Sequence, residues 1–272
     1  MQTEKIKDKY IGSEGKKALY DIHLPVNDNK KLILFIHGYM GFKDWGAWNL
    51  MQEYFVSNGF GFCKLNLTHN GIGLKDVDQF TDLDAFANNS YSKEVEDVKL
   101  FIDFITDTYH SFELILMGHS RGGAIALLNG NHSKVSKIIT LASISSISKR
   151  FSDNEMITNW EKEGIRYVQN QRTKQMMPHN YSQYIDFLEN KETLDIHKCC
   201  LKLKKEVFVF HGENDSSVPI EEGEELANYL NVTLHKVENA DHVFGASHPW
   251  IQKDLPKELK RVADKIILIL NS

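Results

Sequence analysis

The chain has 272 residues, of which 42% are hydrophobic, and it carries 32 lysines and arginines against 37 aspartates and glutamates. A chain of this length can bury most of its unfolded surface in one large core, so we expect one domain, with room for an insertion. The net charge of −5 and the scattered basic residues argue against a nucleic-acid surface. The longest apolar runs, Leu32–Ile36 and Ile266–Leu270, are far shorter than the ~20 residues of a membrane span, so no membrane association is expected.

The N-terminus and the cysteines predict a cytoplasmic protein with reduced thiols. Residues 1–9 alternate in charge and contain no apolar stretch that could serve as a secretory signal. Cys63, Cys199 and Cys200 are odd in number and two are neighbours, which is a poor basis for a disulfide framework. Neither Cys-x-x-Cys nor His-Glu-x-x-His occurs, so we expect no metal site.

Short apolar runs alternate with segments of helical periodicity, a pattern typical of an α/β sheet. An antiparallel edge hairpin is predicted first, at Lys5–Ile11 and Lys17–Leu24. Buried strands follow at Lys31–His37, Gly61–Leu67, Leu114–Gly118, Lys137–Ala142, Val207–His211 and Thr233–Val237. Helices are predicted at Trp45–Asn58, Ser92–Thr108, Arg121–Asn131, Ile220–Leu230 and Pro256–Leu270. Right-handed crossovers then place helices on both faces of a mostly parallel, eight-stranded sheet that binds ligands at the carboxyl ends of its strands.

Residues 143–205 separate two predicted strands and contain no convincing strand of their own. A segment of this length is too long for a simple crossover. We therefore predict a core of residues 1–142 and 206–272, interrupted by a small helical lid over one end of the sheet. The alternative is a set of packed surface helices, because aromatic residues at helical spacing usually mean packing. In a lid, the apolar side chains of Trp160, Met176 and Met177 are candidates for lining a substrate pocket.

The strand Leu114–Gly118 runs directly into Gly118-His119-Ser120-Arg121-Gly122, and a helix follows. At such a turn the backbone is strained, and the glycines flanking the serine remove Cβ atoms that would clash, so the hydroxyl stays exposed. The motif predicts Ser120 as a nucleophile, with Gly118 and Gly122 as the glycines that permit the turn.

A serine nucleophile needs a neighbouring base, and that base needs an orienting carboxylate. Asp215 follows the strand Val207–His211, and His242 follows the strand Thr233–Val237, so both are expected at the same end of the sheet. The order Ser120, Asp215, His242 is the one expected for this sheet topology.

Asp215 and His242 have alternative roles, and other residues are alternative candidates for the acid and the base. Asp215 is also placed to cap the next helix, and His242 to serve as a turn residue. Glu213 and Asp241 are competing acids, and His248 is the fallback base.

The negative charge of a tetrahedral intermediate requires preorganised N–H donors. One candidate is the Arg121 amide, directly after the nucleophile. The other is the amide of Tyr39, in the glycine-containing loop His37-Gly38-Tyr39-Met40-Gly41. His37 and His211 each precede a glycine at a strand end, and this repetition indicates a structural role.

These segments together resemble the α/β-hydrolase superfamily over essentially the whole chain. Within it, His37–Gly41, Gly118–Gly123 and the run His211–Pro219 are most similar to small bacterial carboxylesterases of the cinnamoyl (feruloyl) esterase and dienelactone-hydrolase-like type. The resemblance implies a triad of Ser120, Asp215 and His242, with the Tyr39 and Arg121 amides as the oxyanion hole. The chain departs from many relatives at Asn70-Gly71, where they have His-Gly, and in the insertion.

The expected activity is ester hydrolysis through an acyl-serine intermediate, without a cofactor, on small apolar or aromatic acyl esters. A serine at this turn disfavours the related dehalogenases and epoxide hydrolases, which use aspartate. One alternative is a serine aminopeptidase or acyl-peptide hydrolase on the same triad, for which the insertion offers Asp153, Glu155, Glu161 and Glu163. An alternative of another class is a non-catalytic small-molecule receptor, because a fold alone does not define function.

Overall fold

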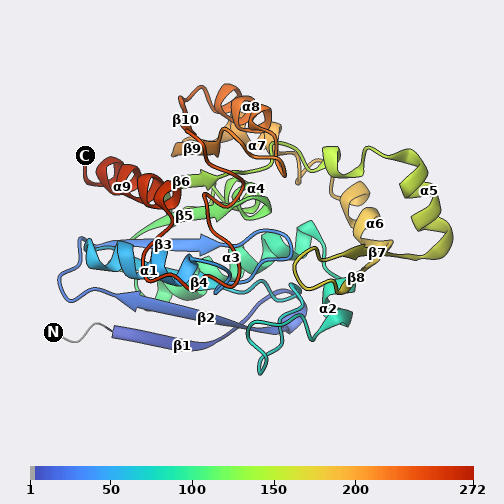
Figure 1. Cartoon of the computed structure of the whole chain (residues 1–272), viewed down its shortest axis with the longest axis horizontal. Helices are drawn as coiled ribbons and strands as arrows, with labels where there is room; N and C mark the ends of the chain where they lie inside the picture. The colour runs from blue at the N-terminus through green and yellow to red at the C-terminus, as the bar shows by residue number, and fades with distance from the viewer. Residues whose placement is uncertain (1–3) are drawn as a thin grey trace.

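The computed structural model describes residues 4–272 (Figure 1). Residues 1–3, part of the predicted core and N-terminal segment, lie outside the described residues. The strands of the large sheet are β1 (Glu4–Ile11), β2 (Lys17–Leu24), β3 (Lys31–Ile36), β4 (Gly61–Leu65), β5 (Glu113–His119), β6 (Val135–Leu141), β9 (Glu206–Gly212) and β10 (Leu234–Val237). The helices outside residues 143–205 are η1 (Ser13–Gly15), α1 (Trp48–Ser57), α2 (Leu83–Ala87), α3 (Tyr91–Thr108), α4 (Arg121–Leu128), α8 (Ile220–Leu230) and α9 (Lys257–Asn271).

The sheet has eight strands in the order β1-β2-β4-β3-β5-β6-β9-β10. β1 pairs antiparallel with β2, and β2 antiparallel with β4, whereas the remaining neighbours are parallel. This arrangement confirms the predicted mostly parallel sheet with an antiparallel hairpin at one edge. No helix within residues 4–272 combines the length and the apolar character that a membrane crossing requires.

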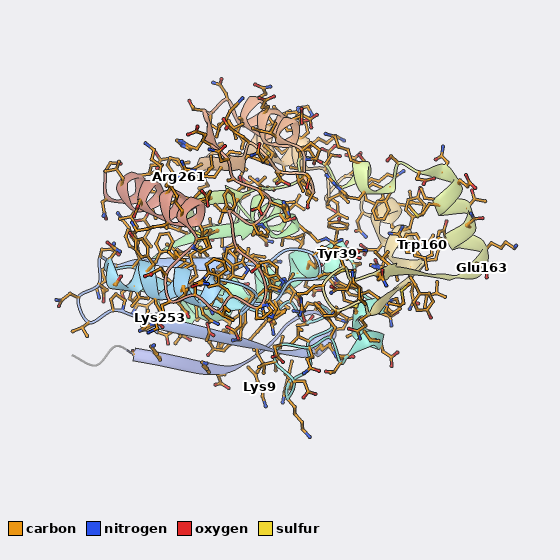
Figure 2. All side chains as sticks on the ribbon, viewed as in Figure 1. Lys9, Tyr39, Trp160, Glu163, Lys253 and Arg261 are labelled. Carbon is orange, nitrogen blue, oxygen red and sulfur yellow. The ribbon has the colours of Figure 1, made fainter. Side chains whose placement is uncertain are left out.

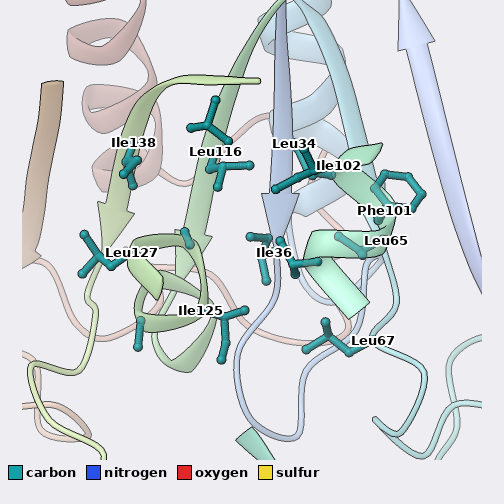
Figure 3. Packing of buried hydrophobic residues seen from close by; sticks show 14 of the residues in the cluster. Leu34, Ile36, Leu65, Leu67, Phe101, Ile102, Leu116, Ile125, Leu127 and Ile138 are labelled. Atoms are coloured by element: carbon teal, nitrogen blue, oxygen red, sulfur yellow. The ribbon is translucent and has the colours of Figure 1, made fainter. Parts of the chain in front are cut away.

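Strict alternation along the central strands divides the core into two layers. Leu34 and Ile36 of β3 point to one face, where they belong to a cluster with residues of α3 and α4 (Figure 3). Leu226 of α8 belongs to the same cluster. Ile33 and Phe35 point to the other face, where they pack with residues of α1 and α9. Because side chains alternate in a strand, a fully apolar run such as Leu32–Ile36 requires cover on both faces, as the sequence predicts.

The predicted helical insertion, residues 143–205, also contains a β-hairpin. Its helices are η2 (Ser148–Phe151), α5 (Asn154–Glu163), α6 (Ser182–Glu189) and α7 (Ile196–Lys202), and β7 (Ile165–Gln169) pairs antiparallel with β8 (Met176–Asn180). The expectation of no strand in this segment is therefore wrong.

The sequence does not predict the hairpin because its strands are short and contain both polar and apolar residues without a clear alternation. A compact turn holds them together: the Asn170 side-chain oxygen accepts from the amides of Arg172 and Thr173 at 3.0 and 3.2 Å, and the Asn170 amide donates to the Gln175 carbonyl oxygen. Such side-chain turns are set by single residues, so alternation does not reveal them.

The segment 143–205 divides between the core and a projecting part. α7 packs against α4 and α8, and Ile196 and Cys200 are buried in the core. The elements from η2 to α6 instead extend past the carboxyl ends of the parallel strands, on the side away from the two termini (Figure 1). We call this part, residues 148–190, the projecting segment.

A small apolar cluster joins the projecting segment to the core. Phe42, Ile72, Phe80 and Phe86 of the core loops surround the fully buried Met177 of β8. Phe86 belongs to α2, a five-residue helix that packs against β8 and that the sequence pattern does not predict. The cluster fixes the hairpin over the end of the sheet.

Candidate active site

Ser120 lies at the sharp turn between β5 and α4, where the backbone is strained. Its φ of 55° and ψ of −122° fall in a region that residues with a side chain rarely adopt. A Cβ atom on Gly118 would lie 2.1 Å from the Gly122 carbonyl oxygen, and one on Gly122 would lie 2.3 Å from the Ile36 carbonyl oxygen. The Ser120 amide donates to the Leu141 carbonyl oxygen at 2.8 Å, so the turn is fixed between β3 and β6. The geometry requires both glycines.

Asp215 and His242 lie in the loops that follow the neighbouring strands β9 and β10, and they form a hydrogen-bonded pair. His242 Nδ1–H donates to Asp215 Oδ2 at 2.8 Å, while Asp215 Oδ1 accepts from the amides of Ser217 and Val218, each at 2.9 Å. Burial alone would raise the pKa of Asp215, but hydrogen bonds from His211 and His242 hold that pKa well below its usual value. The ionised carboxylate therefore keeps a proton on Nδ1 and leaves Nε2 of His242 free to accept one.

Two buried histidines hold this pair in place. His119 Nε2–H donates to the His242 carbonyl oxygen at 2.8 Å, and burial lowers the pKa of His119 to about 3, which keeps the ring neutral. His211 Nε2 lies 3.3 Å from Asp215 Oδ2 and 2.9 Å from the Val218 carbonyl oxygen. Sequence reasoning anticipated a structural role for His211 but missed His119, although it occupies the variable position just before the serine.

The loop after β3 approaches the candidate nucleophile closely. A Cβ atom on Gly38 would lie 2.9 Å from Ser120 Cβ, and the Gly41 amide closes a tight turn onto the Gly38 carbonyl oxygen at 3.1 Å. Within residues 4–272, the amides of Tyr39 and Arg121 donate to no backbone carbonyl oxygen. These two amides are therefore the candidate oxyanion donors.

His37 braces this loop against the one that follows β4. Its Nδ1–H donates to the Gly38 carbonyl oxygen at 2.9 Å, so Nε2 is the acceptor for the Leu67 amide and the Asn70 side-chain amide, both at 3.2 Å. Asn70, which departs from the histidine of many relatives, also caps its own turn by accepting from the Ile72 amide at 3.0 Å. His37 and Asn70 thus act as structural residues.

Because burial lowers the pKa of His37 to about 4, this residue makes stability depend on pH. The neutral ring is favoured in the folded state, so the stabilisation is present above the unfolded pKa of about 6.5 and is lost as the pH falls towards 4. The unfolding free energy of the wild-type protein should fall between pH 7 and pH 5, and we expect that of His37→Gln to fall by about 2 kcal/mol less. Urea denaturation at both pH values measures the two changes. His110→Gln, at an exposed position, is the control and is expected to keep the wild-type pH dependence. Equal losses in wild type and His37→Gln would contradict the assignment.

Ser120 and His242 open into a cavity of about 740 Å³ at the carboxyl ends of the parallel strands. This volume lies within the usual range for small-molecule sites. The core loops contribute part of the lining, and η2, the β7–β8 hairpin with its turn, and α6 contribute to the rest of it together with the loops after β6, β9 and β10. The aromatic lining consists of Tyr39, Trp45, Trp48, Tyr91 and Phe151. The cavity thus combines aromatic side chains with many polar and charged ones.

The three residues predicted to line a pocket lie elsewhere in the projecting segment. Trp160 is buried and donates from Nε1 to the His179 carbonyl oxygen at 2.8 Å. Met177 fills the apolar cluster under β8, and Met176 is exposed. The projecting segment reaches the cavity instead through residues such as Arg166, which a search for apolar side chains does not find.

The competing acids and the fallback base lie outside the hydrogen-bonded pair. Asp241 Oδ1 accepts from the amides of Val243 and Gly245 and so caps its own turn. Glu213 is exposed. His248 accepts the Gly46 amide at Nδ1 and stacks on Trp45. Residues 4–272 hold no group of three or more His, Cys, Asp or Glu side chains that could hold a metal ion.

The sheet topology, the strained serine turn and the loops that follow β9 and β10 define the α/β-hydrolase superfamily. Residues 27–200, more than half of the chain, match the family described as serine aminopeptidase, S33, and the chain belongs to this hydrolase family.

Solved structures show the same fold along the whole chain. A ferulic acid complex of Est1E from Butyrivibrio proteoclasticus is 18% identical, with a TM-score of 0.70, over 96% of this chain and 97% of that one. The esterase domain of a Rhodothermus marinus protein is 17% identical, with a TM-score of 0.66, over 99% and 98%. A thermostable carboxyl esterase from Bacillus coagulans is 14% identical, with a TM-score of 0.68, over 99% of each chain. No curated protein matches the chain.

Proposed function

We propose that the protein is a serine carboxylesterase that cleaves small esters through an acyl-serine intermediate. The observation that carries the proposal is the convergence of Ser120 and His242 on one cavity, with His242 oriented by the buried Asp215. A strained serine, a base with a free Nε2 and two unoccupied amides are the groups that acyl transfer requires. The likeness to structures titled as esterases supports the choice of ester over other acyl substrates.

The proposed reaction has two matched halves. Ser120 Oγ attacks the ester carbonyl carbon while His242 Nε2 takes its proton, and the amides of Tyr39 and Arg121 stabilise the oxyanion. The intermediate expels the alcohol, which receives the proton from His242, and leaves an acyl group on Ser120. A water molecule then attacks the acyl carbon while His242 Nε2 takes its proton. The bond between that carbon and Ser120 Oγ breaks, the carboxylic acid leaves, and His242 returns the proton to Ser120. Asp215 stabilises the imidazolium in both halves.

A serine aminopeptidase is the second candidate, because the family description names that activity. Such an enzyme has to hold a free, positively charged amino terminus, for which carboxylates are the natural partners. Among residues 4–272, no aspartate or glutamate lines the cavity, and Asp153, Glu155, Glu161 and Glu163 lie outside its lining. Figure 2 shows Glu163 on the far side of Trp160 from Tyr39, at the outer edge of the projecting segment. The charge of the cavity therefore favours the esterase.

The two candidates separate in a substrate panel. Initial rates are measured on p-nitrophenyl esters from acetate to octanoate and on methyl ferulate, and then on aminoacyl p-nitroanilides, with Ser120→Ala as the blank. We expect Ser120-dependent turnover of esters, with rates that change with acyl length because the cavity is finite. Turnover of the anilides without turnover of the esters would contradict the esterase proposal and favour the aminopeptidase.

A fluorophosphonate probe, which forms a covalent bond with activated serines, distinguishes an enzyme from a receptor that reuses the fold. We expect labelling of wild type and none of Ser120→Ala. A wild-type protein that neither turns over any substrate nor reacts with the probe would favour the receptor.

A further inference from the structure

The charge of the cavity lining is strongly one-sided. It includes Arg121, Arg150, Arg166 and Arg172, and the lining within residues 4–272 includes no aspartate, glutamate or lysine. A buried arginine needs a partner, because a desolvated charge without one is costly. Some of these charges are neutralised by the protein itself, and the remainder are available to a ligand.

Two of the arginines are paired within the protein. Arg121 Nη1 lies 3.2 Å from Oε1 of the buried Glu94, and its guanidinium stacks between the rings of Tyr39 and Tyr91 at 4.6 and 4.5 Å. Arg150 forms an ion pair with Glu222. These two residues therefore have structural explanations that need no ligand.

Arg166 and Arg172 have no carboxylate partner within 4.0 Å in residues 4–272. Arg172 is exposed and can be hydrated, but Arg166 is half-buried and its Nε is enclosed without a hydrogen-bond partner. The acceptor that the structure gives its guanidinium is the sulfur of Met156, which is a weak one. One face of the group stacks on Trp160 at 4.2 Å, and stacking leaves the in-plane N–H groups available for an acceptor.

The hairpin directs Arg166 towards the catalytic loops. Arg166 pairs directly with His179 across β7 and β8, so their side chains share one face of the hairpin. His179 on that face contacts Tyr39, whose hydroxyl lies 2.8 Å from His179 Nε2. Tyr39 in turn carries one candidate oxyanion amide. Figure 2 shows Tyr39 at the end of the sheet that faces Trp160, the residue on which Arg166 stacks.

We infer that the substrate carries an anionic group, most simply a carboxylate, which binds to Arg166 while the ester carbonyl lies at Ser120. This inference rests on the proposed esterase function and adds the class of substrate: half-esters of dicarboxylic acids rather than neutral esters. The planar guanidinium suits a carboxylate because it can donate two parallel hydrogen bonds. The aromatic lining accommodates the apolar part that joins the two ends.

The test compares kcat/KM for monomethyl succinate, glutarate, adipate and suberate with kcat/KM for methyl esters of unbranched fatty acids of matched length, by acid release in a pH-stat. For at least one length, we expect wild type to prefer the half-ester tenfold or more, and the preference to fall with added salt. Arg166→Gln is expected to lower this preference about ten- to a hundredfold, the usual effect of losing a charged hydrogen bond. Arg166→Lys keeps the positive charge but cannot donate two parallel hydrogen bonds, so we expect part of the preference to remain.

Lys162→Gln is the matched control. It removes one positive charge from the same segment, but its side chain is 80% exposed and lies outside the cavity lining. We expect it to keep the wild-type preference. A wild type that prefers neutral esters at every length would overturn the inference, as would an equal preference in wild type and Arg166→Gln.

A separate measurement distinguishes failure of this inference from failure of the esterase proposal. Turnover of neutral esters without a half-ester preference refutes the anion site alone. If no ester is hydrolysed, adipate binding is followed by tryptophan fluorescence, because Trp45 and Trp48 line the cavity. Binding that Arg166→Gln weakens tenfold supports the anion site without the esterase, and binding that is absent or unchanged overturns both.

Discussion

Replacing Ser120 by alanine is expected to lower kcat on any ester that the wild-type protein hydrolyses by about 10⁶, the loss typical of a removed nucleophile. The hydroxyl is the atom that forms the acyl bond, and no other hydroxyl is held at the turn between β5 and α4 in the described chain. Alanine keeps the Cβ atom and the strained backbone, so the unfolding free energy should change little. Rates on p-nitrophenyl butyrate and a urea denaturation curve measure both quantities.

Ser133→Ala serves as the control for this substitution. Ser133 is exposed, precedes β6 and lies outside the cavity lining, so its loss should leave the rate within twofold of wild type. If Ser120→Ala retained a tenth of the wild-type rate with its fold intact, another group would be the nucleophile and the proposed mechanism would be wrong.

Local patterns were sufficient to predict the core of the fold. The apolar run Leu32–Ile36 requires cover on both faces, and the structure provides it with α1 and α9 on one side and α3 and α4 on the other. The helix α8 begins and ends where its periodicity predicts, at Ile220 and Leu230. The serine turn is equally local, because its strain and its two glycines lie within five residues.

The part of the cavity lining that the projecting segment contributes could not be predicted in this way, because contacts between residues distant in the sequence build it. His179 and Tyr39 are 140 positions apart, yet their hydrogen bond connects the hairpin to the oxyanion loop. Their apolar character favours Trp160 and Met177 as lining residues, but packing buries both, and Arg166 lines the cavity instead. An amphipathic pattern predicts which residues are buried, but it does not predict which polar residues line a cavity.

The second large effect is expected at Asp215, which acts on the reaction through His242. Asparagine has nearly the same shape, but its amide nitrogen donates where the carboxylate accepted, so it favours the His242 tautomer with the proton on Nε2. That tautomer cannot take the proton of Ser120, and the positive charge of the imidazolium loses its partner. We expect Asp215→Asn to lower kcat by about 10⁴. KM should change little, because Asp215 does not line the cavity.

Glu213→Gln is the matched control for Asp215→Asn. It changes an exposed carboxylate in the same loop, two residues away, and should leave kcat within twofold of the wild-type value. The residual rate of Asp215→Asn should rise with pH above neutrality more steeply than the wild-type rate, because hydroxide can then assist the deprotonation that His242 no longer performs. Equal kcat losses in both variants would mean that the charge of the loop matters and not the hydrogen bond, since of the two carboxylates Asp215 is the one that accepts a hydrogen bond from the His242 ring. The tautomer of His242, set by a buried carboxylate, is therefore the part of the site that this pair of variants isolates.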